Sequence, residues 1–381
     1  DVWAEGWVMD VNIGDSHRFL ERTRVLALAA ALALLAGCDP VARMEQLHHR
    51  DGPPPVPPEV LAYADTATEW VGGPRHARGE RGSIGIMILW NGFDPSCVAM
   101  MPAIEAWHEA YARYGVRITG LHFAPYAFAA DSAVVGANTR RLGLRFASAV
   151  LSAPPPAGLN AGRGPVVIWP GGGDPAPHWL TTPSDANAFE ARIRQKLRQT
   201  RPDAGFPADA ALGVAREAVP PMPVRTLRLG THGIERGPIR GAAVDRAQPF
   251  VSPFRAEQEG PLDTPVPVGW WTPRADAIEA ARGGAANVLA IRYDAGPLGL
   301  VMAPPTATVA KVWVLQDEKW LDAADAGEDV RYDSRGASYV DVGETRLYAV
   351  TRGGAHVLKL SPDVAGVLFH AITIEAAPAR P

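Results

Sequence analysis

Cysteine is scarce in this chain: its 381 residues include only two, Cys38 and Cys97. Two thiols are too few for a disulfide-stabilised scaffold or for a metal site built from four thiolates. An excess of positive charge is lacking as well, because 37 Lys and Arg residues stand against 41 Asp and Glu residues and the formal net charge is -4. Without a basic field that gathers phosphates, no nucleic-acid partner is expected.

A hydrophobic run long enough to cross a membrane is also missing near the N-terminus. The apolar segment there covers only residues 25–36 and follows Arg18, Arg22 and Arg24. Its twelve residues are fewer than the roughly 20 that a helix needs to cross a bilayer. A basic stretch followed by a short apolar run is typical of a signal for export. The sequence therefore predicts an exported protein.

Leu35-Ala36-Gly37-Cys38, directly after this run, resembles the lipobox of bacterial lipoprotein signal peptides. The resemblance implies that residues 1–37 are a leader and signal peptide that is cut off before Cys38. Lipid on the Cys38 sulfur would then anchor the protein to a bacterial membrane, on its periplasmic or extracellular face. An ordinary secretory signal and a buried apolar helix are the alternatives. Residues 38–75, with the Pro-rich stretch 52–58, are expected to be a linker between the anchor and the folded part.

The rest of the chain is long enough for two hydrophobic cores, since 47% of the residues are hydrophobic and 20% are charged. Over residues 76–200, short apolar runs alternate with helical patterns, and Asp94-Pro95 is a typical helix start. The expected elements are strand 84–90, helix 94–114, strand 116–123, helix 131–141, strand 164–169 and helix 184–197. This order begins with a βαβ unit and is that of an α/β thioredoxin-like domain.

Residues 90–102, Trp-Asn-Gly-Phe-Asp-Pro-Ser-Cys-Val-Ala-Met-Met-Pro, resemble the Trp-x-x-x-Cys-x-x-Cys-x-x-x-x-Pro segment of TlpA-type thioredoxin-like proteins. Residues 120–128, Gly-Leu-His-Phe-Ala-Pro-Tyr-Ala-Phe, resemble a tract of the DipZ-like branch. The resemblance places Asp94 at the family's first, attacking cysteine and Cys97 at the second. The family's cis-proline and the substrate groove beside it, where polypeptide binds, then correspond to Gly164, Pro165, Trp90 and Phe93.

The catalytic candidates are therefore Cys97 and, at the position of the missing cysteine, Asp94. A dithiol carrier needs both sulfurs, so ordinary thiol-disulfide exchange is disfavoured. Three roles for Cys97 stay open: an inert core thiol, a lone thiol in redox chemistry, and the reactive thiol of a single-cysteine thiol peroxidase. The start of a helix favours its thiolate, whereas the charge of Asp94 disfavours it. His108 and His122 are the histidines that could assist it.

From residue 269 onward the pattern changes to short β-rich runs separated by Gly, Pro and Asp. These runs lie at 288–294, 298–302, 308–315, 338–342, 346–351, 356–360 and 367–374. Seven short strands without a long helix between them predict an all-β antiparallel sandwich at residues 269–376. Residues 201–268 are expected to be a connecting segment with one or two short strands.

This second half resembles the carbohydrate-module-like sandwich that follows the thioredoxin-like domain in DipZ-type proteins. Sugar binding by exposed tryptophans and calcium binding by the acidic residues 317–333 are the less favoured roles of this half. Core tryptophans and a solvated acidic loop are the alternatives to them. The tryptophans concerned are Trp270, Trp271, Trp313 and Trp320. Docking of a protein partner, or of the thioredoxin-like half itself, is the favoured role.

Two functions follow from these observations. The first is a membrane-anchored extracytoplasmic thioredoxin-like protein with a degenerate Asp-x-x-Cys site, in redox chemistry or envelope biogenesis. The second is a non-catalytic protein that binds polypeptide or acts as a scaffold in the cell envelope. Neither function requires a cofactor or a metal, and His48-His49 is interpreted as polar linker. The expected partners are the membrane, through lipidated Cys38, and an extracytoplasmic protein.

Overall fold

Two β-sheets, one mixed and one antiparallel, carry the fold in the part of the chain that the computed structural model describes. The described residues are 58–375 except 76–82, 157–158, 160–163, 170–175, 208–223, 233–238, 240, 253–259, 295 and 307. They belong to one compact unit, Pro55–Pro381. Residues 1–57, with the expected signal peptide and Cys38, lie outside the described residues.

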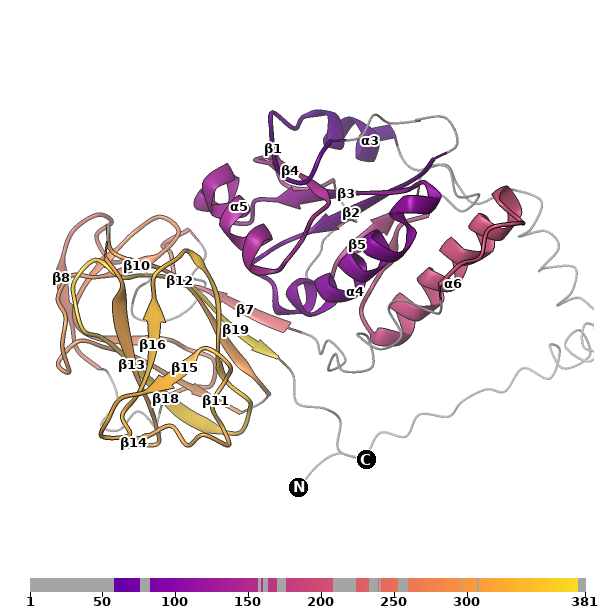
Figure 1. Cartoon of the computed structure of the whole chain (residues 1–381). Coiled ribbons are helices and arrows are strands. Elements are labelled where there is room, and N and C mark those ends of the chain that lie inside the picture. Colours follow the sequence, from indigo (N-terminus) through magenta and orange to yellow (C-terminus); the bar gives the residue numbers. More distant parts are fainter. Residues whose placement is uncertain are drawn as a thin grey trace, which may run out of the picture. The chain divides into compact units, whose positions relative to one another are not determined.

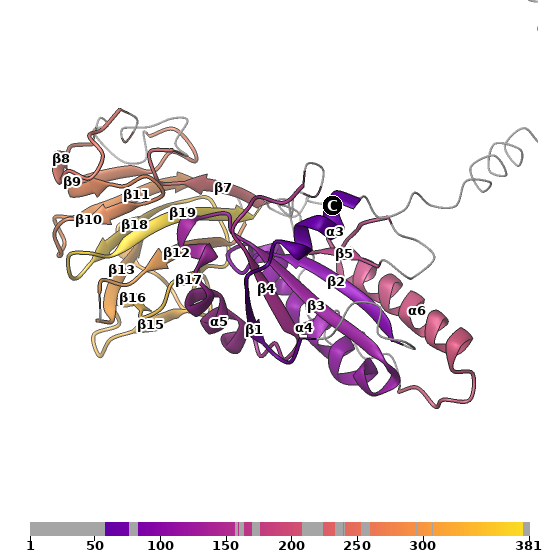
Figure 2. The same cartoon turned by 90° about the horizontal axis from the view of Figure 1, so that it is seen from above.

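The mixed sheet has six strands in the order β1-β4-β3-β2-β5-β6, and Figures 1 and 2 show its first five strands side by side. β2, β3 and β4 run parallel, whereas β1, β5 and β6 pair antiparallel with their neighbours. The bounds are β1 Glu69–Gly72, β2 Ile84–Trp90, β3 Val116–Phe123, β4 Ala147–Leu151, β5 Val166–Ile168 and β6 His178–Trp179. All residues of β4 and β5 are buried, which is typical of strands inside a sheet that is covered on both faces.

Helices connect these strands in the order of a thioredoxin-like fold. α4 is the crossover between parallel β2 and β3, and β5, β6 and α6 follow as the second half of the fold. The bounds are α3 Pro58–Asp65, α4 Pro95–Tyr111, α5 Ser132–Arg141 and α6 Pro183–Thr200, with 3-10 helices η1 Ala112–Tyr114 and η2 Ala127–Ala130. Figure 1 shows α4 and α6 beside each other, and their apolar side chains share one core cluster. The α/β part of the predicted fold class is confirmed.

Local capping sets where the helices begin. The side chains of Asp94 and Asp131 cap α4 and α5 by accepting hydrogen bonds from backbone N–H groups. At the start of α6, Thr182 and Asp185 each accept a hydrogen bond from the other's backbone N–H, which is a capping box. Such caps each contribute about 1 kcal/mol. α4 continues through Pro102 to the end of its last turn.

Five elements of this half were not predicted from the sequence: α3, β1, β4, β6 and the 3-10 helix η2. α3 and β1 lie within residues 38–75, where the sequence indicated a linker, and β1 pairs with β4 along its whole length. Their brevity hides them, since β1 has four residues and β6 two. β4 begins Ala-Ser-Ala, small residues with weak strand preference.

The antiparallel sheet has thirteen strands among the described residues. Ten follow the path β15-β16-β13-β18-β11-β9-β10-β19-β12-β17, while β14, β7 and β8 pair with β13, β19 and β9. The bounds are β7 Val224–Arg228, β8 Gln248–Phe250, β9 Val266–Pro273, β10 Ile278–Ala280, β11 Val288–Tyr293, β12 Leu298–Ala303, β13 Ala310–Gln316, β14 Lys319–Trp320, β15 Val330–Tyr332, β16 Ser338–Val342, β17 Arg346–Thr351, β18 His356–Pro362 and β19 Leu368–Glu375. The seven strands predicted after residue 288 are present, and the antiparallel β-rich part of the fold class is confirmed. β7 and β8 are the short strands expected in residues 201–268.

β9 joins two parts of this sheet because it changes partner along its length. Val266–Val268 pair with β11, whereas Trp271–Pro273 pair with β10. Between them Gly269 has a φ of 95°, and a Cβ there would lie 2.5 Å from the carbonyl oxygen of Ala286, so the change of partner requires glycine. Side chains from both parts belong to one hydrophobic cluster, among them Leu289, Val312, Leu300 and Phe369.

Candidate functional site

Asp94 is the N-cap of α4 and stands where the resemblance expects an attacking cysteine. Its Oδ1 accepts a hydrogen bond from the N–H of Cys97 at 3.1 Å. The residue is 8% exposed, and burial is the main reason why the pKa of Asp94 rises to about 6, although backbone hydrogen bonds from Cys97 and Ser96 act in the opposite direction. A carboxyl group cannot form a mixed disulfide, so Asp94 serves the helix rather than thiol exchange.

Cys97, the one cysteine among the described residues, has no exposed surface. Its side chain belongs to an apolar cluster on the sheet with Tyr63, Met87, Leu89, Leu151 and Leu159. Burial raises the pKa of the Cys97 thiol, the charge of Asp94 raises it further, and a hydrogen bond with the backbone of Asn91 lowers it in part. Desolvation therefore outweighs the stabilisation of the thiolate by the N-terminus of α4, and the thiol is protonated at neutral pH.

His122 does not act as a base toward Cys97 in this arrangement. Its Nε2 accepts a hydrogen bond from the N–H of Gly92 at 3.1 Å, and its ring meets that of Trp90 edge-on, with 4.8 Å between the centroids. Burial lowers the pKa of His122 to about 3, so the ring is neutral. The sequence named His122 as a helper of the thiol; the structure assigns it to holding the loop that precedes Asp94.

His108 is too far along α4 to assist Cys97. The two residues are eleven positions apart on one helix, which corresponds to about 16 Å at 1.5 Å per residue. The His108 ring packs instead against Phe146, with 6.0 Å between the centroids.

The residues predicted to line a substrate groove are all buried. Trp90 has no exposed surface and Phe93 is 2% exposed, and Gly164 and Pro165 are buried as well. The carbonyl oxygen of Pro165 accepts a hydrogen bond from the N–H of Leu180 at 2.9 Å, so this carbonyl group already has a partner within the protein. In this conformation the four residues do not form the walls of an open groove.

A row of residues from the antiparallel sheet covers Phe93. Leu347 of β17 lies opposite Val301 of β12, Val301 opposite Ala371 of β19, and Ala371 opposite Arg228 of β7. Residues that pair directly across strands share one face of a sheet, so these four present one surface, which we call the contact row. Three of them form a hydrophobic cluster with side chains of the thioredoxin-like half; the members from that half are Phe93, Val98, Ala124, Tyr126, Phe128, Ala129 and Val134.

A β-bulge in β19 adds His370 to the same surface. Val301 pairs with Ala371, but the next residue of β12, Met302, pairs with Phe369, which leaves His370 as the extra residue. A bulge redirects a side chain that would otherwise point to the opposite face. The ring of His370 lies over Phe128, with 4.2 Å between the centroids, and the guanidinium of Arg228 lies 5.2 Å from the ring centre of Tyr126.

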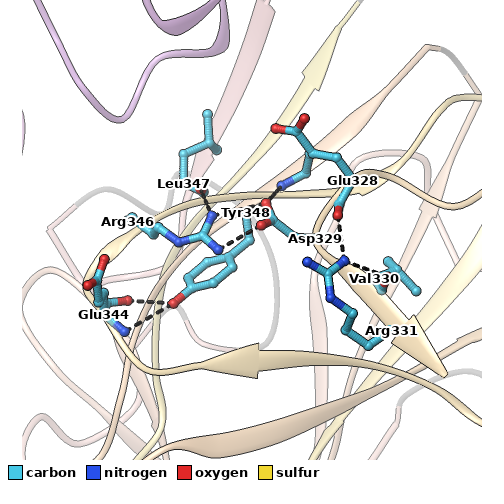
Figure 3. Close-up of polar contacts among 9 residues, drawn as sticks. Glu328, Asp329, Val330, Arg331, Glu344, Arg346, Leu347 and Tyr348 are labelled. Atoms are coloured by element: carbon cyan, nitrogen blue, oxygen red, sulfur yellow. Dashed lines mark hydrogen bonds and ion pairs between the residues drawn. The ribbon is translucent and has the colours of Figure 1, made fainter. Parts of the chain in front are cut away.

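Polar contacts hold the border of this surface. The Nδ2 of Asn138 in α5 donates to the carbonyl oxygen of Thr345, just before β17, at 3.1 Å. Nearby, Arg346 binds Asp329 with both terminal nitrogens, at 2.6 and 3.0 Å, and its guanidinium lies 3.8 Å from the ring centre of Tyr348 (Figure 3). The bidentate pair stabilises the start of β17 where the contact row begins.

The tryptophans considered for sugar binding do not share one platform. Trp271 is fully buried, and Trp313 and Trp320 are tilted by 57° to each other. Within the described residues no group of three His, Cys, Asp or Glu side chains is arranged to bind a metal ion. The helices that the structure describes include none that is both long and apolar enough to span a membrane.

No protein-family model and no curated protein sequence matches this chain. Among solved structures, the chain is similar to one from Chlorobium tepidum, described as a candidate thiol:disulfide interchange protein DsbE. The match has 18% sequence identity and a TM-score of 0.25, and covers 30% of this chain and 81% of that one. At this level of similarity we draw no conclusion on activity from it, and the thioredoxin-like fold rests on the strand order and helix connections.

Proposed function

We propose that this protein is a non-catalytic thioredoxin-like binding or scaffold protein of the cell envelope, exported and anchored by lipid on Cys38. The observation that supports the proposal best is the burial of Cys97, with no exposed surface and a raised pKa. A thiol acts as a nucleophile only as an accessible thiolate. Cys97 is neither accessible nor a thiolate at neutral pH, which argues against the redox role and the thiol peroxidase role.

The contact row adds a second argument. In a thioredoxin-like redox protein the start of this helix has to meet a partner's disulfide. Here Phe93 and Val98, on either side of Asp94 and Cys97, pack with strands of the following sheet. We propose that the former active-site face has become an internal contact, and that the protein partner binds elsewhere.

The finer architecture belongs to the same proposal. Strands from the two parts of the antiparallel sheet contribute to one hydrophobic cluster, which supports a β-sandwich of the kind found after the thioredoxin-like domain in DipZ-type proteins. The lipobox-like residues 35–38 support export and anchoring by lipid on Cys38.

Alkylation of Cys97 tests the loss of catalysis. In a Cys38→Ser background, Cys97 is the one thiol left in the sequence, and its labelling by iodoacetamide is followed from pH 6 to pH 10 by mass spectrometry. The matched control adds Ala99→Cys, two residues along the same helix and exposed. We expect the control thiol to label at least a hundredfold faster than Cys97 in the folded protein and at a similar rate in guanidinium chloride. Equal rates in the folded protein would refute the proposal.

Anchoring is tested separately in cells that export the full chain. Incorporation of an alkynyl fatty acid and recovery in the membrane fraction are expected for the natural sequence. Cys38→Ala should abolish both, whereas Cys97→Ala should leave both unchanged. A lipid label that persists in Cys38→Ala would remove the anchor from the proposal.

A further inference from the structure

A cavity of about 320 Å³ lies between the edge strand β6 and helix α6. Its walls come from residues 177–180, around β6, and from a set of residues of α6, namely Asp185, Ala188, Phe189 and Arg192. The helical residues follow the spacing i, i+3, i+4 and i+7, so they lie on one face of α6. The volume is at the lower end of the roughly 300–1,000 Å³ of known ligand sites. It has room for one or two side chains of a partner.

Backbone groups of β6 border this cavity with one edge open. β6 is the last strand of the mixed sheet and pairs with β5 alone among the described strands. The N–H of Leu180 donates to the carbonyl oxygen of Pro165, on the β5 side. Backbone groups of successive residues point to opposite sides of a strand, so those of Trp179 point away from β5. Within the described ranges no hydrogen bond uses the backbone N–H of Trp179. Such an edge is a place where another strand can pair.

The cavity combines an apolar floor with a cationic wall. Leu180 and Phe189 are almost fully buried, and the rings of His178 and Phe189 lie 5.6 Å apart between centroids. Arg192 lies beside them, with 2.8 Å between its Nη1 and the Nε2 of His178. The imidazole accepts this hydrogen bond in its neutral form, and the guanidinium keeps its positive charge. The wall therefore favours an anionic group.

Asp185, the carboxylate in the described wall of the cavity, is used by the start of α6. Its Oδ2 accepts hydrogen bonds from the N–H groups of Thr181 and Thr182 at 2.9 and 2.8 Å, and from the hydroxyl of Thr181 at 2.7 Å. Partial burial acts to raise the pKa of Asp185, but these hydrogen bonds outweigh it and hold the pKa below its ordinary value. The negative charge is thus balanced by its own donors and leaves the attraction of Arg192 for an anion in place.

We propose that this cavity binds an extended acidic peptide of a protein partner, which pairs antiparallel with the free edge of β6 and places a glutamate side chain beside Arg192. Strand addition of this kind takes affinity from main-chain hydrogen bonds and specificity from pockets for alternate side chains. A peptide residue opposite Trp179 points away from α6, and its two neighbours point toward α6. The methylene groups of a glutamate then lie on Phe189, and its carboxylate meets the guanidinium.

The inference rests on the proposed function, because it names the site where a binding protein meets its partner. It uses none of the residues of the contact row, in agreement with a partner that binds away from the former active-site face. The free edge distinguishes a peptide from other anions, since only a peptide backbone supplies both a donor and an acceptor in the spacing of a strand.

Titration calorimetry of the Cys38→Ser chain with short peptides at low ionic strength is the test. The probe is acetyl-Thr-Glu-Val-Glu-Thr-amide, and the matched control peptide has glutamine in place of both glutamates. We expect the glutamate peptide to bind at least tenfold more tightly than the glutamine peptide. An N-methyl group on the central valine removes the donor that would pair with Trp179, and it should weaken binding at least tenfold as well. These comparisons leave the protein unchanged.

Variants of α6 locate the charge. Arg192→Gln should weaken binding of the glutamate peptide at least tenfold and change that of the glutamine peptide by less than twofold. Arg198→Gln, at an exposed position of the same helix, is the control and should change either affinity by less than twofold. In NMR spectra the glutamate peptide should shift the amide signal of Trp179 and slow its hydrogen exchange.

Equal affinities of the glutamate and glutamine peptides would overturn the site, as would an N-methyl group without effect. Tighter binding of polygalacturonate than of the glutamate peptide, lost in Arg192→Gln, would assign the cavity to an anionic polysaccharide and overturn the peptide. These failures are distinct from failure of the proposed function. Absence of peptide binding with a slowly alkylated Cys97 overturns the peptide site alone, whereas a reactive Cys97 overturns the proposed function.

Discussion

The rings of His370 and Phe128 lie 4.2 Å apart between centroids, although one residue belongs to the antiparallel sheet and the other to the thioredoxin-like half. The β-bulge of β19 makes this possible, because it turns His370 to the same side as Ala371. Since the contact joins the two halves, its energy is a measure of how strongly they are coupled.

A double-mutant cycle measures that energy. We expect His370→Ala and Phe128→Ala each to lower the free energy of unfolding and the pair to show a coupling of about 0.5–1.5 kcal/mol, the range for ring contacts. Urea denaturation at pH 7.5 provides the four values. A cycle between Phe128 and Tyr332, an exposed ring of β15, is the control and should show no coupling. Absence of coupling between His370 and Phe128 would mean that the ring contact does not form in solution.

Stability should fall in acid because of His122. The pKa of His122 is about 3 in the folded chain against an ordinary 6.5, so above pH 6.5 the ring is neutral in both states and its contribution is complete. As the pH falls from 6.5 toward 3, the unfolded chain binds a proton that the folded chain does not. The free energy of unfolding then decreases by about 1.4 kcal/mol per pH unit from this group.

Replacement by glutamine isolates the effect. His122→Gln keeps an acceptor for the Gly92 N–H but does not titrate, so the difference from the parent protein should shrink as the pH falls from 7 to 4 in urea denaturation. His232→Gln, at an exposed position, is the control. Parallel curves for the parent and His122→Gln would contradict the buried neutral imidazole.

Gly120 of β3 is predicted to be intolerant of a methyl group. A Cβ at this position would lie 2.1 Å from Ser148 Oγ and 2.9 Å from Trp90 Nε1. We expect Gly120→Ala to destabilise the protein by about 1–3 kcal/mol, the usual cost of overpacking a core. Gly85→Ala on β2, where nothing lies within 4 Å of the new atom, should be neutral or slightly stabilising. Adding Ser148→Ala to Gly120→Ala should recover part of the loss, since it removes the nearest atom.

The Arg346–Asp329 pair of Figure 3 is predicted to depend on the guanidinium shape. Lysine retains the charge but cannot bind both oxygens of Asp329 or lie flat on Tyr348. We expect Arg346→Lys to lower the free energy of unfolding by about 1–3 kcal/mol. Arg331→Lys, at an exposed residue that donates to the carbonyl oxygen of Glu328, should change it by less than about 0.5 kcal/mol. Equal effects of the two substitutions would show that the pair contributes only as a surface ion pair.

Much of the fold follows from local sequence. The run Ile84–Trp90 is uniformly apolar and became a nearly fully buried strand, and the Asp94-Pro95 signal marked the start of α4 correctly. Strand β3 begins Val-Arg-Ile-Thr, and this alternation of apolar and polar residues matches the alternating burial at its start. These features depend on neighbours a few residues away, which is why the sequence reveals them.

The state of the site depends on distant residues and was not predictable. The Asp-x-x-Cys pattern left the reactivity of Cys97 open, because its burial is produced by Tyr63 and Leu159 from elements far away in the chain. Likewise, the aromatic residues near Phe93 were as compatible with an open groove as with a packed contact. The contact row and the bulge at His370 arise from pairing between strands that lie far apart in the chain.

The contact row has a consequence for the order of folding. Its members come from residues 228, 301, 347 and 371, so the row is complete only when β19 has joined the sheet. Because domains generally fold as they are synthesised, the thioredoxin-like half reaches its own fold while Phe93 and Val98 are still uncovered. The last helix of that half ends at Thr200, so a nascent chain exposes an apolar face for the time needed to make about 170 further residues, up to Ala371 of β19. This interval is when a chaperone would bind it.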